Sequence, residues 1–231
     1  DWDYQGSPDE VSITADETRY ICAAASAYFK TPVREVDVVW AYSAVRPLLD
    51  DGTSKAQEAT RDYVLKVDGV GDKARLINVF GGKITTYRRL AEAALDGVDD
   101  ALGRTTQAWS GAAALPGGNF AIDGYVGQVA ALAAAYPFLD DRTCRRLVRS
   151  YGTRASEVLG KAQSWVDLGE DFGAGLTARE VRYLQAAEWA QTIDDILWRR
   201  SKLGLRFDGA ARARLGAWLA AHPVAGADAA D

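Results

Sequence analysis

The stretch LINVFGGKITTYRRLAEAAL, residues 76–95, decides the local fold of the first part of this chain. It opens with an apolar run that ends at Gly81 and Gly82, and an apolar run bounded by glycine predicts a buried strand. Beyond the glycines, apolar residues recur at helical spacing from Ile84 to Ala94. The sequence therefore predicts a strand, a Gly-Gly turn and a helix in direct succession.

The first turn of this predicted helix has the chemistry to hold an anion or an electron-rich oxygen. A helix start offers N–H groups without intrahelical partners and the positive end of the helix dipole. Lys83 adds a full positive charge beside Thr85. The segment is not a P-loop, because Ile77 and Ile84 stand where that motif requires Gly and Ser or Thr. An ordinary strand–helix turn with a surface lysine stays open as the alternative.

Further strands are expected around this stretch. Residues 61–67 alternate apolar and polar side chains, as a half-buried strand does. A Gly-rich turn joins them to the strand expected at 75–80, so the two predict a hairpin. Residues 36–44 are rich in valine and aromatic residues, which predicts another strand.

Helical signals flank the strands on both sides. Thr14 and Glu17 have the spacing of a capping box, and a helix is expected over residues 15–30. Residues 96–118 are rich in Gly, Ala and Asp and are expected to form a linker. From residue 119 to residue 231 every strong pattern is that of an amphipathic helix. The sequence thus predicts an α+β segment over 1–95 and an all-α helical bundle over 119–231.

One helix of the predicted bundle carries four arginines opposite its apolar stripe: Arg142, Arg145, Arg146 and Arg149. Such a row is expected to be a solvated face. Contact with anionic lipid or an acidic partner is the alternative.

Composition narrows the function classes. The 231 residues carry a formal net charge of −5, which gives no argument for nucleic acid as a partner. No apolar run is long enough to span a bilayer and no secretory leader is present, so a cytoplasmic protein is expected. Cys22 and Cys144 lack metal-ligand spacing and are expected to be reduced, buried thiols. His222 is the single histidine, which disfavours a metal site or a histidine-based mechanism.

Several long motifs, in this order and spacing, resemble the FAD-dependent glycerol-3-phosphate dehydrogenases of bacteria. They are VWAYSAVRPLLDD at 39–51, ATRDYVLKV at 59–67 and VFGGKITTYRRLAE at 79–92. Segments 165–173 and 194–205 also have counterparts in that family, so the resemblance covers nearly the whole chain.

The resemblance implies an α+β fold of substrate- and FAD-domain strands with flanking helices, followed by a helical cap domain. It implies a glycerol phosphate pocket at Arg46, Arg61 and Lys83. It also implies a cofactor contact beside the flavin ring, where a helix start stabilises negative charge on the reduced ring, at Gly81, Gly82, Lys83, Ile84 and Thr85. The activity implied is oxidation of glycerol 3-phosphate with electrons passed by FAD to membrane quinone. Peripheral attachment to the inner face of the cytoplasmic membrane and a homodimer stay open.

The family's dinucleotide fingerprint, G-x-G-x-x-G after a strand, is absent here, because Gly69 and Gly71 lack the third glycine. The sequence also contains no methionine. We therefore expect the C-terminal portion of a longer protein, which alone would be inactive and would not retain FAD. A phosphate-binding module and a helical protein-interaction domain, both without catalysis, are the two alternatives.

Overall fold

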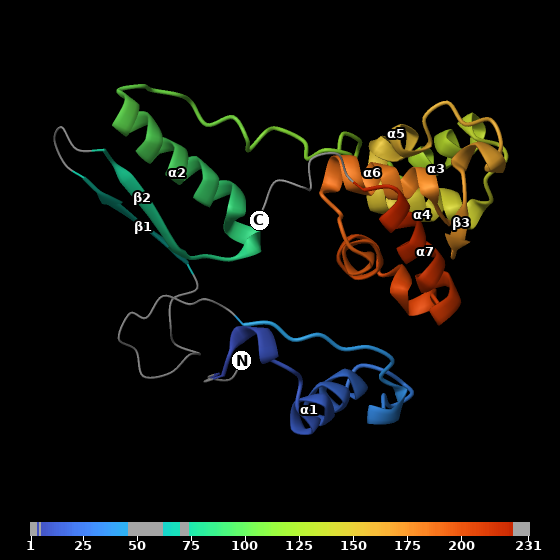
Figure 1. Ribbon diagram of the computed structural model, residues 1–231. Coiled ribbons are helices and arrows are strands. Elements are labelled where there is room, and N and C mark those ends of the chain that lie inside the picture. The colour runs from blue at the N-terminus through green and yellow to red at the C-terminus, as the bar shows by residue number, and fades with distance from the viewer. Residues whose placement is uncertain (1–3, 5, 46–61, 70–73, 224–231) are drawn as a thin grey trace. The chain divides into compact units, whose positions relative to one another are not determined.

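The computed structural model describes residue 4 and residues 6–45, 62–69 and 74–223. It confirms an α+β chain with a helical C-terminal part. The chain divides into two compact units, residues 1–113 and residues 114–231 (Figure 1).

A hairpin and one long helix form the centre of unit 1. Strands β1 (Tyr63–Asp68) and β2 (Leu76–Gly81) pair antiparallel, with Tyr63 opposite Gly81 and Asp68 opposite Leu76. Helix α2 (Tyr87–Leu102) packs on one face, where a Cβ on Gly97 would lie 3.1 Å from Ile77 Cδ1. The hairpin expected from residues 61–67 and 75–80 is therefore confirmed, with each strand ending one residue later than expected.

Helix α1 (Ala15–Ser26) begins where the sequence indicates, since Thr14 and Glu17 form the expected capping box. It is shorter than the predicted range of 15–30. The Ser26 hydroxyl accepts the Val33 N–H at 2.8 Å and donates to the Cys22 carbonyl at 2.7 Å. These bonds fold the following segment back on the last turn and end the helix.

The strand expected at residues 36–44 is absent. Glu35–Asp37 form a 3-10 turn, which the Asp37 carboxylate closes by accepting the Arg34 N–H at 3.0 Å. The Arg34 guanidinium donates to the same carboxylate, and these bonds lower the pKa of Asp37 to about 2. Residues 38–45 are extended but pair with no strand in the described part of the chain. A high content of valine and aromatic residues was not enough to form a strand here, because a strand also needs a second strand to pair with.

The expected linker, 96–118, is partly helical and partly held against a helix. Helix α2 continues to Leu102, and Gly103 ends it in the left-handed conformation, at φ 63°. Beyond this point the buried Asp99 carboxylate accepts the Thr106 N–H at 3.0 Å and the Thr106 hydroxyl. The Ser110 hydroxyl donates to Glu92 at 2.6 Å. Residues up to Ser110 therefore belong to unit 1, because hydrogen bonds tie them to α2.

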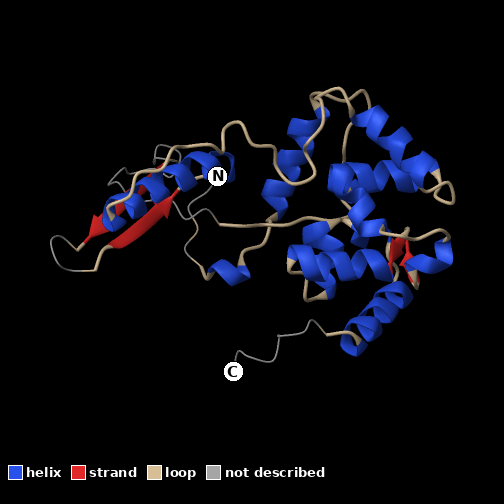
Figure 2. Cartoon of the chain, turned by 90° about the horizontal axis from the view of Figure 1, so that it is seen from above, coloured by secondary structure: helices blue, strands red, loops and turns tan. Residues whose placement is uncertain are grey.

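Unit 2 is a helical bundle with one very short hairpin (Figure 2). Its helices are α3 (Tyr125–Ala135), α4 (Asp141–Tyr151), α5 (Ala155–Leu159), α6 (Ala178–Glu188), a π-helical segment (Asp195–Arg200) and α7 (Gly209–Ala221). The hairpin joins β3 (Asp171–Gly173) to β4 (Leu176–Thr177). Short 3-10 turns complete the described elements of both units: Pro8–Glu10, Ile84–Thr86, Gly152–Arg154, Trp165–Leu168 and Leu203–Arg206.

The core of unit 2 collects apolar residues from its helices and its hairpin. Its fully buried members include Cys144, Phe172, Leu184, Ile196 and Leu215. Both cysteines of the chain are free and buried, as expected. Within the described residues no helix is long and apolar enough to cross a membrane.

The predicted arginine face of α4 is wrong at one position. Arg146 is mostly buried, and its guanidinium donates to both oxygens of Glu180 at 2.7 Å and to the Gly175 carbonyl at 2.7 Å. The Tyr151 hydroxyl also donates to Glu180, and its burial together with the adjacent carboxylate raises the pKa of Tyr151. Through these bonds Glu180 joins α6 to α4, and Arg146 also ties α4 to the loop of the short hairpin at Gly175.

Candidate functional site

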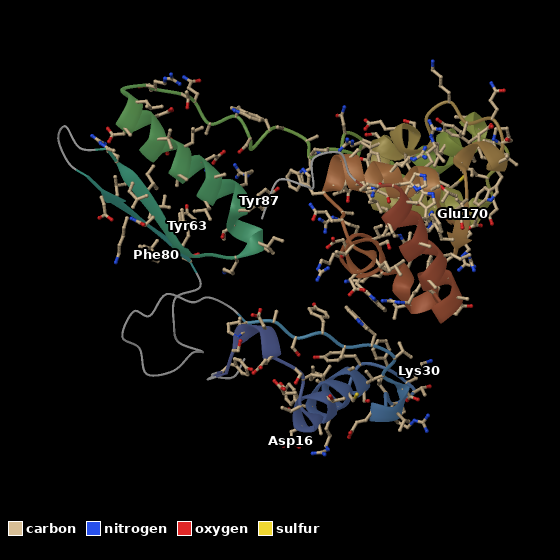
Figure 3. The ribbon with its side chains drawn as sticks, in the orientation of Figure 1. Asp16, Lys30, Tyr63, Phe80, Tyr87 and Glu170 are labelled. Atoms are coloured by element: carbon tan, nitrogen blue, oxygen red, sulfur yellow. The ribbon has the colours of Figure 1, made fainter. Side chains whose placement is uncertain are left out.

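The turn after β2 is the candidate site in unit 1. Gly81 and Gly82 adopt positive φ angles of 69° and 92°, which side chains with a Cβ rarely adopt. A Cβ on Gly82 would also lie 3.4 Å from the Tyr63 Cβ and 3.7 Å from Leu90 Cδ2. Two glycines at this place therefore let the chain turn sharply and leave the backbone accessible. Figure 3 shows the neighbouring side chains of Tyr63, Phe80 and Tyr87, which come from the hairpin and from the start of α2.

The helix after the turn opens with one 3-10 turn, Ile84–Thr86, rather than directly as an α-helix. The Lys83 carbonyl accepts the Thr86 N–H and the Thr86 hydroxyl, each at 2.9 Å. The Lys83 N–H in turn donates to that hydroxyl oxygen at 3.2 Å. The N–H groups of Ile84 and Thr85 have no acceptor among the described residues, as is usual for the first groups of a helix. Two free donors thus sit at the exposed start of the helix.

Side chains at the turn are open to solvent. Lys83 is exposed, and its ammonium has no ion-pair partner in the part of the chain that the structure describes. The Ile84 side chain is 88% exposed, which is unusual for an isoleucine and leaves an apolar surface next to the two donors. A flat ring with an oxygen-rich edge suits this arrangement, so these residues fit one edge of a flavin.

Two of the three predicted phosphate-binding residues, Arg46 and Arg61, lie outside the described residues. Lys83 is the member of that set whose surroundings are known. The phosphate pocket therefore stays a prediction.

The described part of unit 2 contains no second group of side chains arranged like a catalytic or metal site. No group of three or more His, Cys, Asp or Glu side chains suited to a metal ion exists among the described residues. His222 stacks on Trp218 with ring centroids 4.2 Å apart and so packs against the helix that precedes it. The buried Arg146–Glu180 pair is fully satisfied by its neighbours and serves packing. The sequence pattern does not reveal this pair, because Arg146 stands in a row with three arginines that are exposed to solvent.

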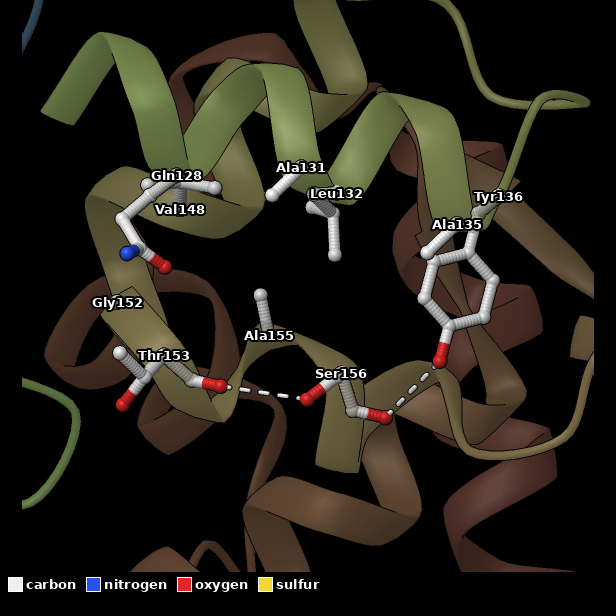
Figure 4. A pocket seen from close by; sticks show the side chains of 10 residues that line it. All are labelled: Gln128, Ala131, Leu132, Ala135, Tyr136, Val148, Gly152, Thr153, Ala155 and Ser156. Carbon is white, nitrogen blue, oxygen red and sulfur yellow. Dashed lines mark hydrogen bonds between the residues drawn. The ribbon is translucent and has the colours of Figure 1, made fainter.

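A small pocket of about 160 Å³ lies among α3, the end of α4 and α5 (Figure 4). Alanine side chains at positions 131, 135 and 155 line it, and Gln128 and Thr153 stand at one end. At the other end the Tyr136 hydroxyl donates to the Gly160 carbonyl at 2.7 Å. The lining carries no charged residue and combines small apolar side chains with the polar Gln128, Tyr136, Thr153 and Ser156.

Comparison with known proteins shows that the second half of the chain is similar to a described domain. Residues 108–219 match the model of the C-terminal domain of alpha-glycerophosphate oxidase. That segment of the chain is therefore similar to this domain.

Relatives extend the similarity over almost the whole chain. It is 42% identical over 224 residues to a glycerol-3-phosphate dehydrogenase of Pseudomonas aeruginosa, covering 96% of this chain and 44% of that protein. It is 41% identical over 220 residues to the aerobic glycerol-3-phosphate dehydrogenase of Escherichia coli, covering 95% and 44%. A D-erythritol 1-phosphate dehydrogenase of Brucella abortus is 39% identical over 216 residues, covering 94% and 43%.

The resemblance expected from the sequence motifs is thus confirmed. The chain is similar to a portion of bacterial glycerol-3-phosphate dehydrogenases, and it spans less than half the length of these three relatives.

Proposed function

We propose that this chain is the C-terminal part of a flavoenzyme that oxidises sn-glycerol 3-phosphate to dihydroxyacetone phosphate. Electrons leave through FAD to a quinone. The observation that carries the proposal is the 42% identity over 96% of the chain to a glycerol-3-phosphate dehydrogenase. The D-erythritol 1-phosphate dehydrogenase among the relatives makes that phosphorylated polyol the second candidate substrate.

The Gly81–Thr85 turn supports a role at the cofactor. FAD, when bound, would accept the hydride that the secondary alcohol of the substrate loses. The Ile84 and Thr85 N–H groups would donate to the oxygen-rich edge of the ring, and the helix start favours negative charge there. Lys83 would add a full positive charge at the same place.

Arg46, Arg61 and Lys83 complete the proposal as the cations that hold the phosphate of the substrate. Arginine suits this task because its planar guanidinium donates two parallel hydrogen bonds to one phosphate.

The test uses the full-length gene product. A purified sample should show the flavin absorption bands and should reduce a dye acceptor with sn-glycerol 3-phosphate. D-erythritol 1-phosphate and unphosphorylated glycerol are the comparison substrates, and glycerol should be far poorer because it lacks the dianion. A colourless protein, or one that uses none of the phosphorylated polyols, would refute the proposed function.

Transfer of electrons to quinone requires the full-length protein to meet the inner face of the cytoplasmic membrane. Sedimentation of the protein with a membrane fraction, and its release by salt, would test this peripheral attachment. Phosphate binding by the 231-residue chain alone would instead favour a simple phosphate-binding module.

A further inference from the structure

The threonine that follows the candidate site binds both backbone groups of Lys83. The Thr86 hydroxyl donates to the Lys83 carbonyl at 2.9 Å, and its oxygen accepts the Lys83 N–H at 3.2 Å. The Thr86 N–H donates to the same carbonyl at 2.9 Å. Thr86 therefore takes the part that Glu or Gln plays in a capping box, because its side chain reaches back to the N–H of the residue at which the turn begins.

The bond from the Lys83 N–H is important because two glycines precede it. Gly81 and Gly82 have φ angles of 69° and 92°, and glycine by itself allows many backbone conformations. The peptide plane between Gly82 and Lys83 is therefore free to rotate unless a hydrogen bond holds it. Among the described residues the Lys83 N–H has the Thr86 hydroxyl as its acceptor and no other. The hydroxyl is thus the group that fixes this plane.

The same hydroxyl decides which backbone groups of the turn stay available to a ligand. Because the N–H and the carbonyl of Lys83 are both bound to Thr86, the donors that remain are the Ile84 and Thr85 N–H groups. Thr86 itself has φ −101° and ψ 1°, outside the α-helical region, and stands directly before α2. Its side chain therefore connects the glycine turn to the start of the helix.

We propose that Thr86 is a positioning residue of the cofactor site, an inference that rests on the proposed function because it takes the Gly81–Thr85 turn to contact the flavin. The hydroxyl keeps the Ile84 and Thr85 N–H groups in one orientation, in which they stabilise negative charge on the reduced ring. Loss of the hydroxyl frees the peptide plane before Lys83 and weakens this stabilisation. The midpoint potential of the bound flavin should then fall, because the reduced form loses more than the oxidised form.

The experiment measures the midpoint potential of the flavin in the full-length protein, after reconstitution with FAD and removal of unbound cofactor. Thr86→Val keeps the shape of the side chain and removes the hydroxyl. It should lower the potential by about 30 mV or more, which for a two-electron couple is a tenfold loss in the preference for reduced over oxidised flavin. Thr86→Ser keeps the hydroxyl and should stay near the wild-type potential.

The matched control is Thr18→Val, which removes a threonine hydroxyl that donates to the Thr14 carbonyl at 2.9 Å in α1, outside the turn. This variant should keep the wild-type potential. A wild-type potential in Thr86→Val overturns the proposal even where the flavin is bound more weakly, since a hydroxyl that only stabilises the turn would weaken binding of both flavin forms alike. An equal fall in Thr86→Ser or in Thr18→Val overturns it as well.

The remaining outcomes separate this proposal from the proposed function. If Thr86→Val holds no flavin, Thr86→Ser decides: a wild-type potential there supports the role of the hydroxyl, and a lowered potential overturns it. A colourless wild-type protein refutes the proposed function and the role of Thr86 together. A yellow wild type whose potential is unchanged in Thr86→Val refutes the role of Thr86 alone.

Discussion

At the scale of single residues, the buried Arg146–Glu180 pair is the contact of unit 2 whose loss should lower the free energy of unfolding most. The Glu180 side chain is 2% exposed and accepts hydrogen bonds from Arg146 and Tyr151. Glu180→Ala would leave a guanidinium buried without its counter-charge, which costs roughly 3–5 kcal/mol in the free energy of unfolding. Urea denaturation monitored by tryptophan fluorescence measures this loss.

The matched control for that change is Glu157→Ala, which removes an exposed partner of Arg154. Solvent and salt screen surface pairs of this kind, so the unfolding midpoint of this variant should barely move. Equal losses in the two variants would mean that the buried pair contributes no more than a surface one.

For the proposed activity, the prediction at the scale of residues concerns Arg46. In the full-length enzyme, Arg46→Ala should lower kcat/KM for glycerol 3-phosphate severely. Loss of one charge-assisted partner of a buried anion costs roughly 2–5 kcal/mol, or about 30-fold to several thousand-fold. Arg46→Lys should rescue only in part, because an ammonium lacks the planar fork. Lys83→Ala should also reduce turnover.

Steady-state kinetics with a dye acceptor checks these variants without the membrane. Arg149→Ala, on the exposed face of α4, is the control and should leave the kinetics unchanged. Near-normal kcat/KM in Arg46→Ala would show that the phosphate pocket is elsewhere.

At the scale of elements, the strand–turn–helix unit depends on the backbone of its two glycines. Gly82→Ala forces a Cβ into a φ of 92° and costs roughly 1–2 kcal/mol. Because the turn presents the Ile84 and Thr85 N–H groups, the full-length variant should also retain less flavin, measured as the ratio of flavin to protein absorbance.

Gly209→Ala provides the comparison for the turn variant. This glycine opens α7, has no positive φ, and a Cβ there would meet nothing within 4 Å. Alanine is the better helix former, so this change should be neutral or slightly stabilising. Full flavin retention in Gly82→Ala would show that the turn does not help to hold the cofactor.

At the scale of the whole molecule, the 231-residue chain contains one edge of the proposed cofactor site and no dinucleotide fingerprint. We therefore expect the purified 231-residue chain to emerge from gel filtration without flavin, while the full-length product keeps it. Absorption spectra of the two eluted samples decide the matter. A yellow 231-residue chain would mean that the contacts in residues 1–231 suffice.

Features set by neighbours along the chain could be determined from the sequence alone. The Thr14–Glu17 capping box and the Gly-Gly turn at residues 81 and 82 both appear in the structure. Each depends on residues within one helical turn or on the conformational freedom of glycine, so its cause is visible in the sequence.

Only the tertiary structure decided features that depend on a distant partner. Residues 38–45 found no strand to pair with in the described part of the chain, although their composition favours one. Arg146 is not solvated as expected, because its guanidinium binds Glu180, 34 positions away in the sequence, inside unit 2. Segment 103–110 is held on α2 because Asp99 and Glu92 accept its hydrogen bonds. The free energy of each of these contacts comes from groups that meet only in the folded chain, which no local pattern of residues records.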